Sequence, residues 1–191
     1  MKQANLQVEL TLLCLVVCCF VFSAHAMNLT MFDSPQEIQK WRVSNDTVMG
    51  GISSSTVTAE GESLLFSGEL RLEYNGGFVS VWRTPEKGLF SDDSERISIT
   101  VKGDGRPYQL RLRTLASPRI SYSASFETTS GEWTTHTFQL SDFTPVWRGR
   151  LVSGAPALRF EDIYQVGFLL ADKNPGDFAL KVQQIVALKQ S

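Results

Sequence analysis

Short runs in which apolar and polar residues alternate are the feature that most constrains the fold of this sequence. An alternation with a period of two places one set of side chains on each face of a β-strand. The candidate strands are 63–67, 69–74, 78–83, 96–102, 108–113, 121–126, 132–140, 163–171 and 177–188. Turn residues such as Asn75-Gly76-Gly77 separate several of these runs. The pattern predicts an all-β sandwich or barrel of about nine strands.

One short helix is expected near the N-terminus. Ser34 has the chemistry of an N-cap, Pro35 suits the first helical position, and Glu37 lies in the first turn. The apolar residues Ile38 and Trp41 follow at helical spacing. Residues 158–163 allow another helical turn.

The first 26 residues have the features of a signal peptide. An apolar run at residues 10–22 precedes Ala24-His25-Ala26, which fits the small-x-small cleavage pattern. The run is shorter than the roughly 20 residues that a membrane-spanning helix needs. We therefore expect a signal peptide at residues 1–26 and a single domain at residues 27–191, exported to the periplasm or outside the cell. The alternative is a cytoplasmic protein that starts at Met27.

Cleavage near Ala26 removes most of the residues that carry metal or covalent chemistry. All three cysteines, Cys14, Cys18 and Cys19, lie in the leader, and His136 is the single histidine beyond it. Disulfides, cysteine-ligated metals and a cysteine nucleophile are thereby excluded. We expect no cofactor, no metal and no catalytic residue. The net charge of −2, without a basic tail, gives no reason to expect nucleic-acid binding.

Several motifs carry a family resemblance in chain order. They are Trp41-x-x-x-Asn45-Asp46-x-Val48-Met49-Gly50-Gly51-x-Ser53, Phe66-Ser67-Gly68, Asn75-Gly76-Gly77-Phe78-x-Ser80-x-x-Arg83, Gly103-Asp104-Gly105-Arg106-x-Tyr108, Arg148-Gly149-Arg150, Gly167-Phe168 and Gly176-x-Phe178-x-Leu180, with Trp133 and Phe143. This set resembles the complex I intermediate-associated protein family. The resemblance implies a galactose-binding-like jelly-roll sandwich. It also implies a non-enzymatic, chaperone-like assembly factor for NADH:ubiquinone oxidoreductase that binds unfolded proteins, and it implies no catalytic residues.

Arginines and aromatic residues supply the candidate binding residues. Arg111 and Arg113 share one face of a strand in a segment that contains no acidic residue, and arginine recognises planar anions with paired hydrogen bonds. The full candidate set is Trp82, Arg83, Arg106, Arg111, Arg113, Tyr122 and Arg148. Another protein is the expected partner. The alternatives are a carbohydrate, bound by an exported carbohydrate-binding module with exposed aromatic rings, and a solvated face whose arginines pair with Glu69 and Glu73.

Two loop clusters are expected to be structural. Their residues are Asn45, Asp46, Gly50, Gly51, Asn75, Gly76, Gly77, Gly103, Asp104 and Gly105. Asn45 and Asp46 have the oxygen atoms to ligate a hard cation, and Gly103–Arg106 has the pattern of an anion-binding nest, so both functional alternatives stay open. A hydrolase would need a nucleophile beside His136, which we expect to be structural.

Overall fold

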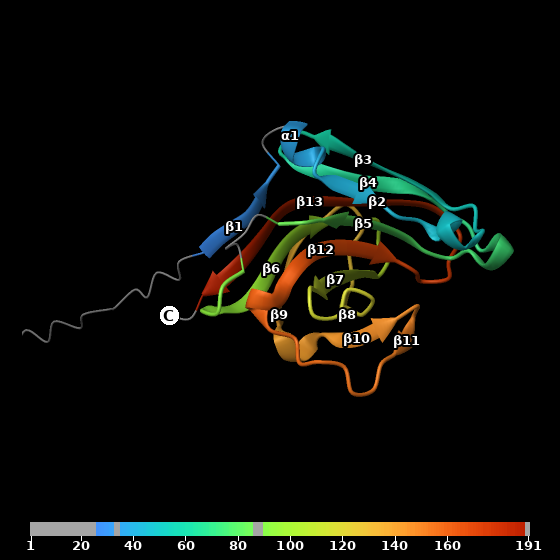
Figure 1. Ribbon diagram of the computed structural model, residues 1–191. Coiled ribbons are helices and arrows are strands. Elements are labelled where there is room, and N and C mark those ends of the chain that lie inside the picture. The colour runs from blue at the N-terminus through green and yellow to red at the C-terminus, as the bar shows by residue number, and fades with distance from the viewer. Residues whose placement is uncertain (1–25, 33–34, 86–89, 190–191) are drawn as a thin grey trace, which may run out of the picture.

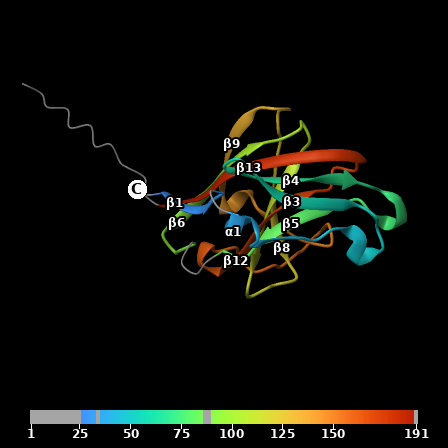
Figure 2. The same ribbon diagram turned by 90° about the horizontal axis from the view of Figure 1, so that it is seen from above.

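Two antiparallel sheets face each other in the computed structural model, which describes residues 26–32, 35–85 and 90–189 (Figures 1 and 2). The first sheet has six strands. Its order is β3 (Ser54–Glu60), β4 (Ser63–Leu70), β13 (Gly176–Lys189), β6 (Ser94–Lys102) and β9 (Trp133–Gln139), with β1 (Ala26–Met31) on β13. The long strand β13 pairs with β4 through its first half and with β1 through its second half.

The second sheet has seven strands. Its order is β11 (Arg150–Leu151), β10 (Thr144–Trp147), β8 (Ser121–Phe126), β7 (Tyr108–Thr114), β12 (Ile163–Leu170), β5 (Val79–Arg83) and β2 (Trp41–Val43). The helical elements are short: α1 (Pro35–Ile38) and the 3-10 turns Asp46–Met49, Glu73–Asn75, Leu140–Asp142 and Phe160–Asp162. The described part of the chain contains no helix with the length and apolar character that crossing a membrane requires.

The core lies between the sheets, and the alternation in the sequence decides which side chains enter it. In β7, Tyr108, Leu110 and Leu112 point inward and are fully buried, so the residues between them lie on the opposite face. Facing residues of β13, such as Leu180 and Val182, are also fully buried. Each large apolar side chain contributes about 1.5–3 kcal/mol by leaving water. The predicted all-β jelly-roll sandwich is confirmed.

The details differ from the prediction at two places. The helix ends at Ile38, and Trp41 begins β2 instead, because its ring enters the core and packs 6.1 Å from Phe168 between ring centroids. The predicted strand 69–74 does not form, since β4 ends at Leu70 and a turn with positive φ at Tyr74 and Asn75 follows.

The described residues form thirteen strands rather than about nine. The additional ones are β1, β2, β3, β10 and β11, and most of them lie at sheet edges. The predicted signal peptide lies almost wholly outside the described residues, which begin with β1 at Ala26. The leader and the domain boundary after it therefore stay predictions.

Candidate functional site

The side of the seven-stranded sheet that is turned away from the core brings together residues from four neighbouring strands. Strand register places Trp82 of β5 beside Gly167 of β12, and Gly167 beside Arg111 of β7. Arg113 lies two residues along β7 and pairs with Gln165. We call this group of buried and half-buried residues the arginine face; its members are Ser80, Trp82, Gln109, Arg111, Arg113, Ser121, Gln165 and Gly167.

Trp82 is fixed from two sides. Its ring lies against Gly167, where an added Cβ would come within 2.7 Å of a ring carbon. Its indole N–H donates to the Ser80 hydroxyl at 3.0 Å. The guanidinium carbon of Arg113 lies 3.8 Å from the ring centroid, a stacked cation–π contact. Trp82 is 7% exposed, so Arg113 and Gly167 cover most of the surface that a ligand ring would use.

Arg111 is almost completely buried, with 8% of its surface exposed. Its Nη1 donates to the Gln109 side-chain oxygen at 2.8 Å, and its Nη2 donates to the Ser121 hydroxyl. The same Gln109 oxygen accepts from Ser123 at 3.0 Å. The Nε of Arg111 is buried and has no hydrogen-bond partner. Neutral oxygens therefore orient this guanidinium without compensating its charge.

Arg113 has still fewer partners. Its Nη1 donates to the Gln165 side-chain oxygen at 3.1 Å, and its buried Nε has no partner. Gln165 is itself held by a 3.4 Å hydrogen bond from its amide nitrogen to the Thr84 hydroxyl. The guanidinium is thus positioned by Trp82 and Gln165, and its Nε edge stays unused.

The charge of the arginine face is uncompensated within the described residues. Neither Arg111 nor Arg113 has an ion pair with a described carboxylate. Burial, with a smaller contribution from the neighbouring Arg113, lowers the pKa of Arg111 to about 10, and burial also lowers the pKa of Arg113. Both remain cations at neutral pH, in surroundings that favour a negative charge nearby.

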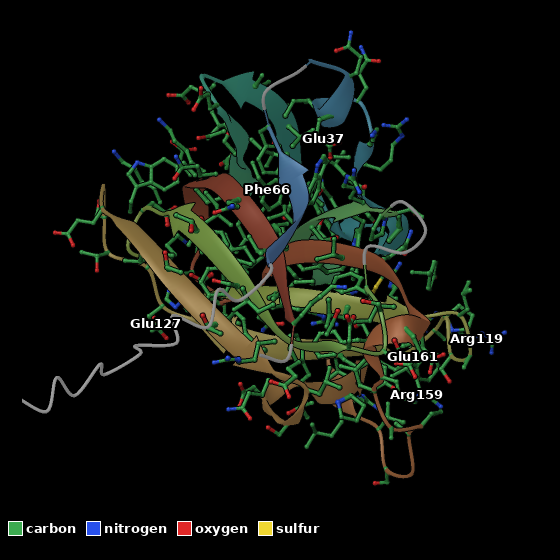
Figure 3. The ribbon with its side chains drawn as sticks, turned by 90° about the vertical axis from the view of Figure 1, so that its left-hand side faces the viewer. Glu37, Phe66, Arg119, Glu127, Arg159 and Glu161 are labelled. Carbon is green, nitrogen blue, oxygen red and sulfur yellow. The ribbon has the colours of Figure 1, made fainter. Side chains whose placement is uncertain are left out.

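The remaining candidate residues lie elsewhere. Arg83 points into the core, is 3% exposed, and pairs with Glu37 of α1, which Figure 3 labels at the α1 end of the sandwich. Tyr122 also points inward and donates to the Pro156 carbonyl at 2.6 Å. Arg148 is exposed in the β10–β11 turn, where its guanidinium carbon lies 5.2 Å from the Trp147 ring. These residues are not part of the arginine face.

Arg106 holds the loop before β13 in place through several hydrogen bonds. Its Nε and Nη2 donate to the two carboxylate oxygens of Asp172 at 2.9 and 2.7 Å. Further N–H groups bond the backbone carbonyls of Asn174, Gly176 and Asp177. Because its N–H groups are occupied in this way, Arg106 has no pair of unoccupied donors for the anion-binding site considered at Gly103–Arg106.

The turn around Asp104 is similarly saturated. The Asp104 carboxylate accepts from the Arg106 and Ala179 backbone N–H groups at 3.1 and 2.9 Å and from the Tyr108 hydroxyl at 3.0 Å. Gly103 packs against Thr128, where a Cβ would come within 2.3 Å of the hydroxyl oxygen, and Gly105 has a φ of +94°. These contacts are those of a structural turn.

Asp46 joins two loops that lie side by side at one end of the sandwich, one after β2 and one between β4 and β5 (Figures 1 and 2). Its carboxylate is fully buried and accepts from the Ser53 N–H at 3.0 Å, the Ser53 hydroxyl at 2.5 Å and the Gly77 N–H at 2.7 Å. Gly51 and Gly76 pack directly on it, so an added Cβ would approach its atoms to 2.4 and 2.8 Å.

The other residues of this cluster hold the two loops in shape. Asn45 accepts from the Ser55 hydroxyl at 2.7 Å, while Gly50, Asn75 and Gly77 have positive φ. The described residues contain no group of three or more His, Cys, Asp or Glu side chains placed to hold a metal ion. The Asp46 carboxylate is occupied by N–H and O–H donors, which is the environment of a structural anion rather than of a cation ligand.

His136 packs against aromatic residues. Its ring centroid lies 5.1 Å from that of Phe126 and 6.4 Å from that of Phe138. Its Nε2 lies 3.1 Å from the Thr134 hydroxyl, and burial lowers its pKa. These contacts are those of a packed structural side chain.

Sequence reasoning missed the residues that support the arginines. Period two on β7 places Gln109 on the same face as Arg111, so this neighbour could have been found. Ser121, Gln165 and Gly167 come from β8 and β12, and their positions depend on cross-strand register. The alternation of apolar and polar residues within one strand does not indicate how that strand is aligned with its neighbours.

The fold is that of a carbohydrate-binding-module-like jelly roll. The chain aligns with the family 11 carbohydrate-binding module of a cellulosomal cellulase from Clostridium thermocellum at a TM-score of 0.60 and 14% identity, over 85% of this chain and 95% of that one. It also aligns with an agarase at a TM-score of 0.61 and 11% identity, over 87% of this chain and 25% of the agarase. At such identities the likeness concerns the fold alone.

The family follows from the sequence comparison. The model of the Complex I intermediate-associated protein 30 (CIA30) family matches residues 30–182, and the chain belongs to this family. "Probable complex I intermediate-associated protein 30, mitochondrial" from Caenorhabditis elegans is 25% identical over 184 residues, covering 81% of this chain and 52% of the relative. The mouse protein "Complex I intermediate-associated protein 30, mitochondrial" is 26% identical over 186 residues, covering 86% and 57%. The chain spans about half the length of these curated relatives.

The predicted localisation is wrong. The prediction of export to the periplasm or outside the cell rested on an apolar leader that lies outside the described residues, and the cytoplasmic alternative rested on a start at Met27. The curated relatives that share the domain are named as mitochondrial proteins. A short apolar run followed by a small-x-small site indicates a leader, and here it did not predict the compartment named for these relatives.

Proposed function

We propose that this chain is a non-enzymatic binding domain with a role in complex I assembly, and that it holds a partner protein on the arginine face. The observation that carries the proposal is the pair of neighbouring cations on β7, the buried Arg111 and the half-buried Arg113, which have no described carboxylate as a partner. The membership in the CIA30 family and the printed names of the relatives support the assembly role. A chaperone-like preference for unfolded segments is part of the proposal.

The shape of the site favours binding over chemistry. The residues around the two arginines are glutamine, serine, tryptophan and glycine, which orient a ligand but offer no general base. Buried cations with neutral neighbours are costly in an isolated domain. A partner that supplies the missing negative charge would gain this free energy on binding.

Partner capture tests the proposal. The full chain is used as bait in a native lysate of the cells that produce it, with Arg111→Glu/Arg113→Glu as the test variant. Arg150→Glu/Arg159→Glu is the charge-matched control, since both of its arginines are exposed and neither is a member of the arginine face. We expect wild type and control to enrich complex I subunits and the test variant to lose them. Equal enrichment by the two double variants would contradict the proposal.

Carbohydrate binding is the second candidate function, and one observation favours it. Trp147 is 48% exposed and lines a shallow pocket of 420 Å³ with Ser117, Pro118, Arg119, Ile120 and Val152. An exposed indole with polar neighbours suits a sugar ring, and the fold neighbours include carbohydrate-binding modules. Calorimetric titration with soluble β-glucans, comparing wild type with Trp147→Ala, tests it. Heat that is absent, or unchanged in the variant, would rule this pocket out as a sugar site.

A further inference from the structure

We propose that Arg111 and Arg113 form a carboxylate-binding site that takes an aspartate or glutamate side chain of a partner protein. This inference rests on the proposed function and names the chemistry that the arginine face recognises. Three sets of observations carry it: the way Arg83 and Arg106 are paired, the N–H groups without a partner on Arg111 and Arg113, and the contacts that hold their surroundings.

Two other arginines show how the protein pairs a guanidinium that is largely shielded from water. Arg83 binds the two carboxylate oxygens of Glu37 through Nε and Nη2, and Arg106 binds those of Asp172 through the same two nitrogens. In both pairs the carboxylate lies along the Nε–Nη2 edge of the guanidinium plane, which is the bidentate geometry of strong arginine–carboxylate pairs. Both carboxylates belong to this chain.

On Arg113 the same edge has no carboxylate partner among the described residues. Its Nε is buried without a partner, and its Nη2 has no hydrogen bond to a described residue, while Nη1 is used by Gln165. On Arg111, Nε is also buried without a partner, and Nη2 is bound only by a neutral hydroxyl. A carboxylate on Arg113 would therefore repeat the arrangement of Arg83 and Arg106, with Arg111 adding a second positive charge beside it.

The site is held in shape before any ligand arrives. Trp82 stacks on the face of the Arg113 guanidinium, and Trp82 is itself fixed by Ser80 and Gly167. Gln109 and Gln165 each accept one arginine N–H group. Little side-chain freedom would be lost on binding, which favours affinity. Trp82 is a positioning residue in this scheme.

The chemistry selects a carboxylate over a sugar. The Trp82 ring is covered by Arg113 and cannot stack on a sugar without displacing the cation. The unused donors are N–H groups of two cations, and an anion with two coplanar oxygens satisfies the Nε–Nη2 edge best. A partner protein presents such groups on aspartate and glutamate side chains.

The experiment observes the arginine Nε–H signals directly. The full chain is labelled with ¹⁵N and titrated with a capped glutamate-containing peptide, the matching glutamine peptide, and free glutarate. We expect the glutamate peptide to shift the Nε–H resonances of Arg111 and Arg113, and the glutamine peptide to leave them unchanged. Arg113→Gln should weaken binding of the glutamate peptide about tenfold or more, while Arg150→Gln should not.

Two further variants separate recognition from folding. Arg113→Lys keeps the charge without the planar fork, and Trp82→Phe keeps the stacking ring without the Ser80 hydrogen bond. Both are checked by the dispersion of the backbone amide spectrum. We expect weaker peptide binding in both, with a larger loss for Arg113→Lys, since lysine offers a point charge in place of the bidentate edge.

Each remaining outcome has a definite meaning. Equal shifts with the glutamine peptide, or no shift with the glutamate peptide, would overturn the carboxylate site. Binding of free glutarate as tight as that of the peptide would assign the site to a small dicarboxylate and overturn the partner-protein assignment. If partner capture depends on Arg111 and Arg113 while the glutamate peptide does not bind, the proposed function stands and this inference fails.

Discussion

Asp46 and Arg111 are both buried charged side chains, and their surroundings are opposite. The carboxylate of Asp46 accepts hydrogen bonds from Ser53, Gly77 and Phe78, so each of its oxygens is satisfied inside the fold. The guanidinium of Arg111 has two neutral oxygens as partners and a buried Nε with none. A buried charge that is fully hydrogen-bonded holds a structure together, whereas one that is left unsatisfied weakens it.

The pKa values follow the same contrast. Burial alone would raise the pKa of Asp46, but the hydrogen bonds from Ser53, Gly77 and Phe78 outweigh it, and the pKa is lowered. For Arg111, burial and the neighbouring Arg113 act together and lower the pKa to about 10. The fold therefore stabilises the charged form of Asp46 and destabilises the charged form of Arg111. We interpret the first as part of the scaffold and the second as part of a binding surface.

The largest expected loss of stability comes from removing the fully hydrogen-bonded carboxylate of Asp46. Asp46→Ala leaves the N–H groups of Ser53, Gly77 and Phe78 without their acceptor, and we expect the free energy of unfolding to fall by about 3–5 kcal/mol. Urea unfolding followed by tryptophan fluorescence measures this loss. The control is Asp93→Ala, whose carboxylate is exposed and pairs with Lys189, and it should leave the unfolding midpoint nearly unchanged. A comparable loss in both variants would contradict the structural role of Asp46.

Removing the carboxylate that pairs with Arg83 would give this arginine the same uncompensated charge as Arg111. Glu37→Gln keeps the shape of the side chain but removes the negative charge opposite Arg83, which is 3% exposed. We expect the variant to lose about 2–3 kcal/mol, because a buried cation then lacks its counter-charge. Thermal unfolding measures it, and Glu37→Leu/Arg83→Met should recover most of the loss. No loss in Glu37→Gln would show that the fold tolerates an unpaired buried arginine without cost.

Removing the uncompensated charge of Arg111 should raise the stability of the fold rather than lower it. Arg111→Met keeps much of the aliphatic packing and removes the desolvated guanidinium, so we expect stability to rise by about 0–1 kcal/mol. The same variant should bind its partner more weakly. A loss of more than about 2 kcal/mol would mean that Arg111 belongs to the scaffold in the way Asp46 does.

The smallest expected effect is a pH dependence. Since the pKa of Asp46 is lower in the folded protein than in the unfolded chain, where it is about 3.9, its ionisation adds stability above that pH. This contribution is lost as the pH falls through the folded-state pKa. The stability difference between wild type and Asp46→Asn should therefore shrink as the pH falls below about 4. Denaturant unfolding from pH 7 to pH 3 measures it, and a difference that is constant with pH would be evidence against the lowered pKa.

The sequence predicted those parts of the site that lie within one strand. Alternation in residues 108–113 placed Arg111 and Arg113 together on one face, and their position opposite Tyr108, Leu110 and Leu112 follows from the same period. The position of Trp82 could not be predicted, because Val79 and Val81 compete with it for the inward face. The inward face of β5 is set by its pairing with β12, whose register joins residues far apart in the chain.

Long-range ion pairs explain the candidate residues that lie elsewhere. Arg83 meets Glu37 from a separate helix, and Arg106 meets Asp172 from the loop before β13. Local sequence shows an arginine in each case and gives no sign of the acid that neutralises it. The turn chemistry around Asn75-Gly76-Gly77 was visible in the sequence, but the role of Asp46 in joining that turn to residues 46–53 was not.

The most direct test of the arginine face measures whether a ligand relieves its uncompensated charge. Thermal unfolding of the wild type and of Arg111→Met/Arg113→Gln is recorded with and without a capped glutamate-containing peptide. A ligand that binds only the folded state raises its unfolding midpoint. We predict that the peptide raises the midpoint of the wild type and leaves that of the double variant unchanged. An equal rise in both proteins, or no rise in the wild type, would contradict the account.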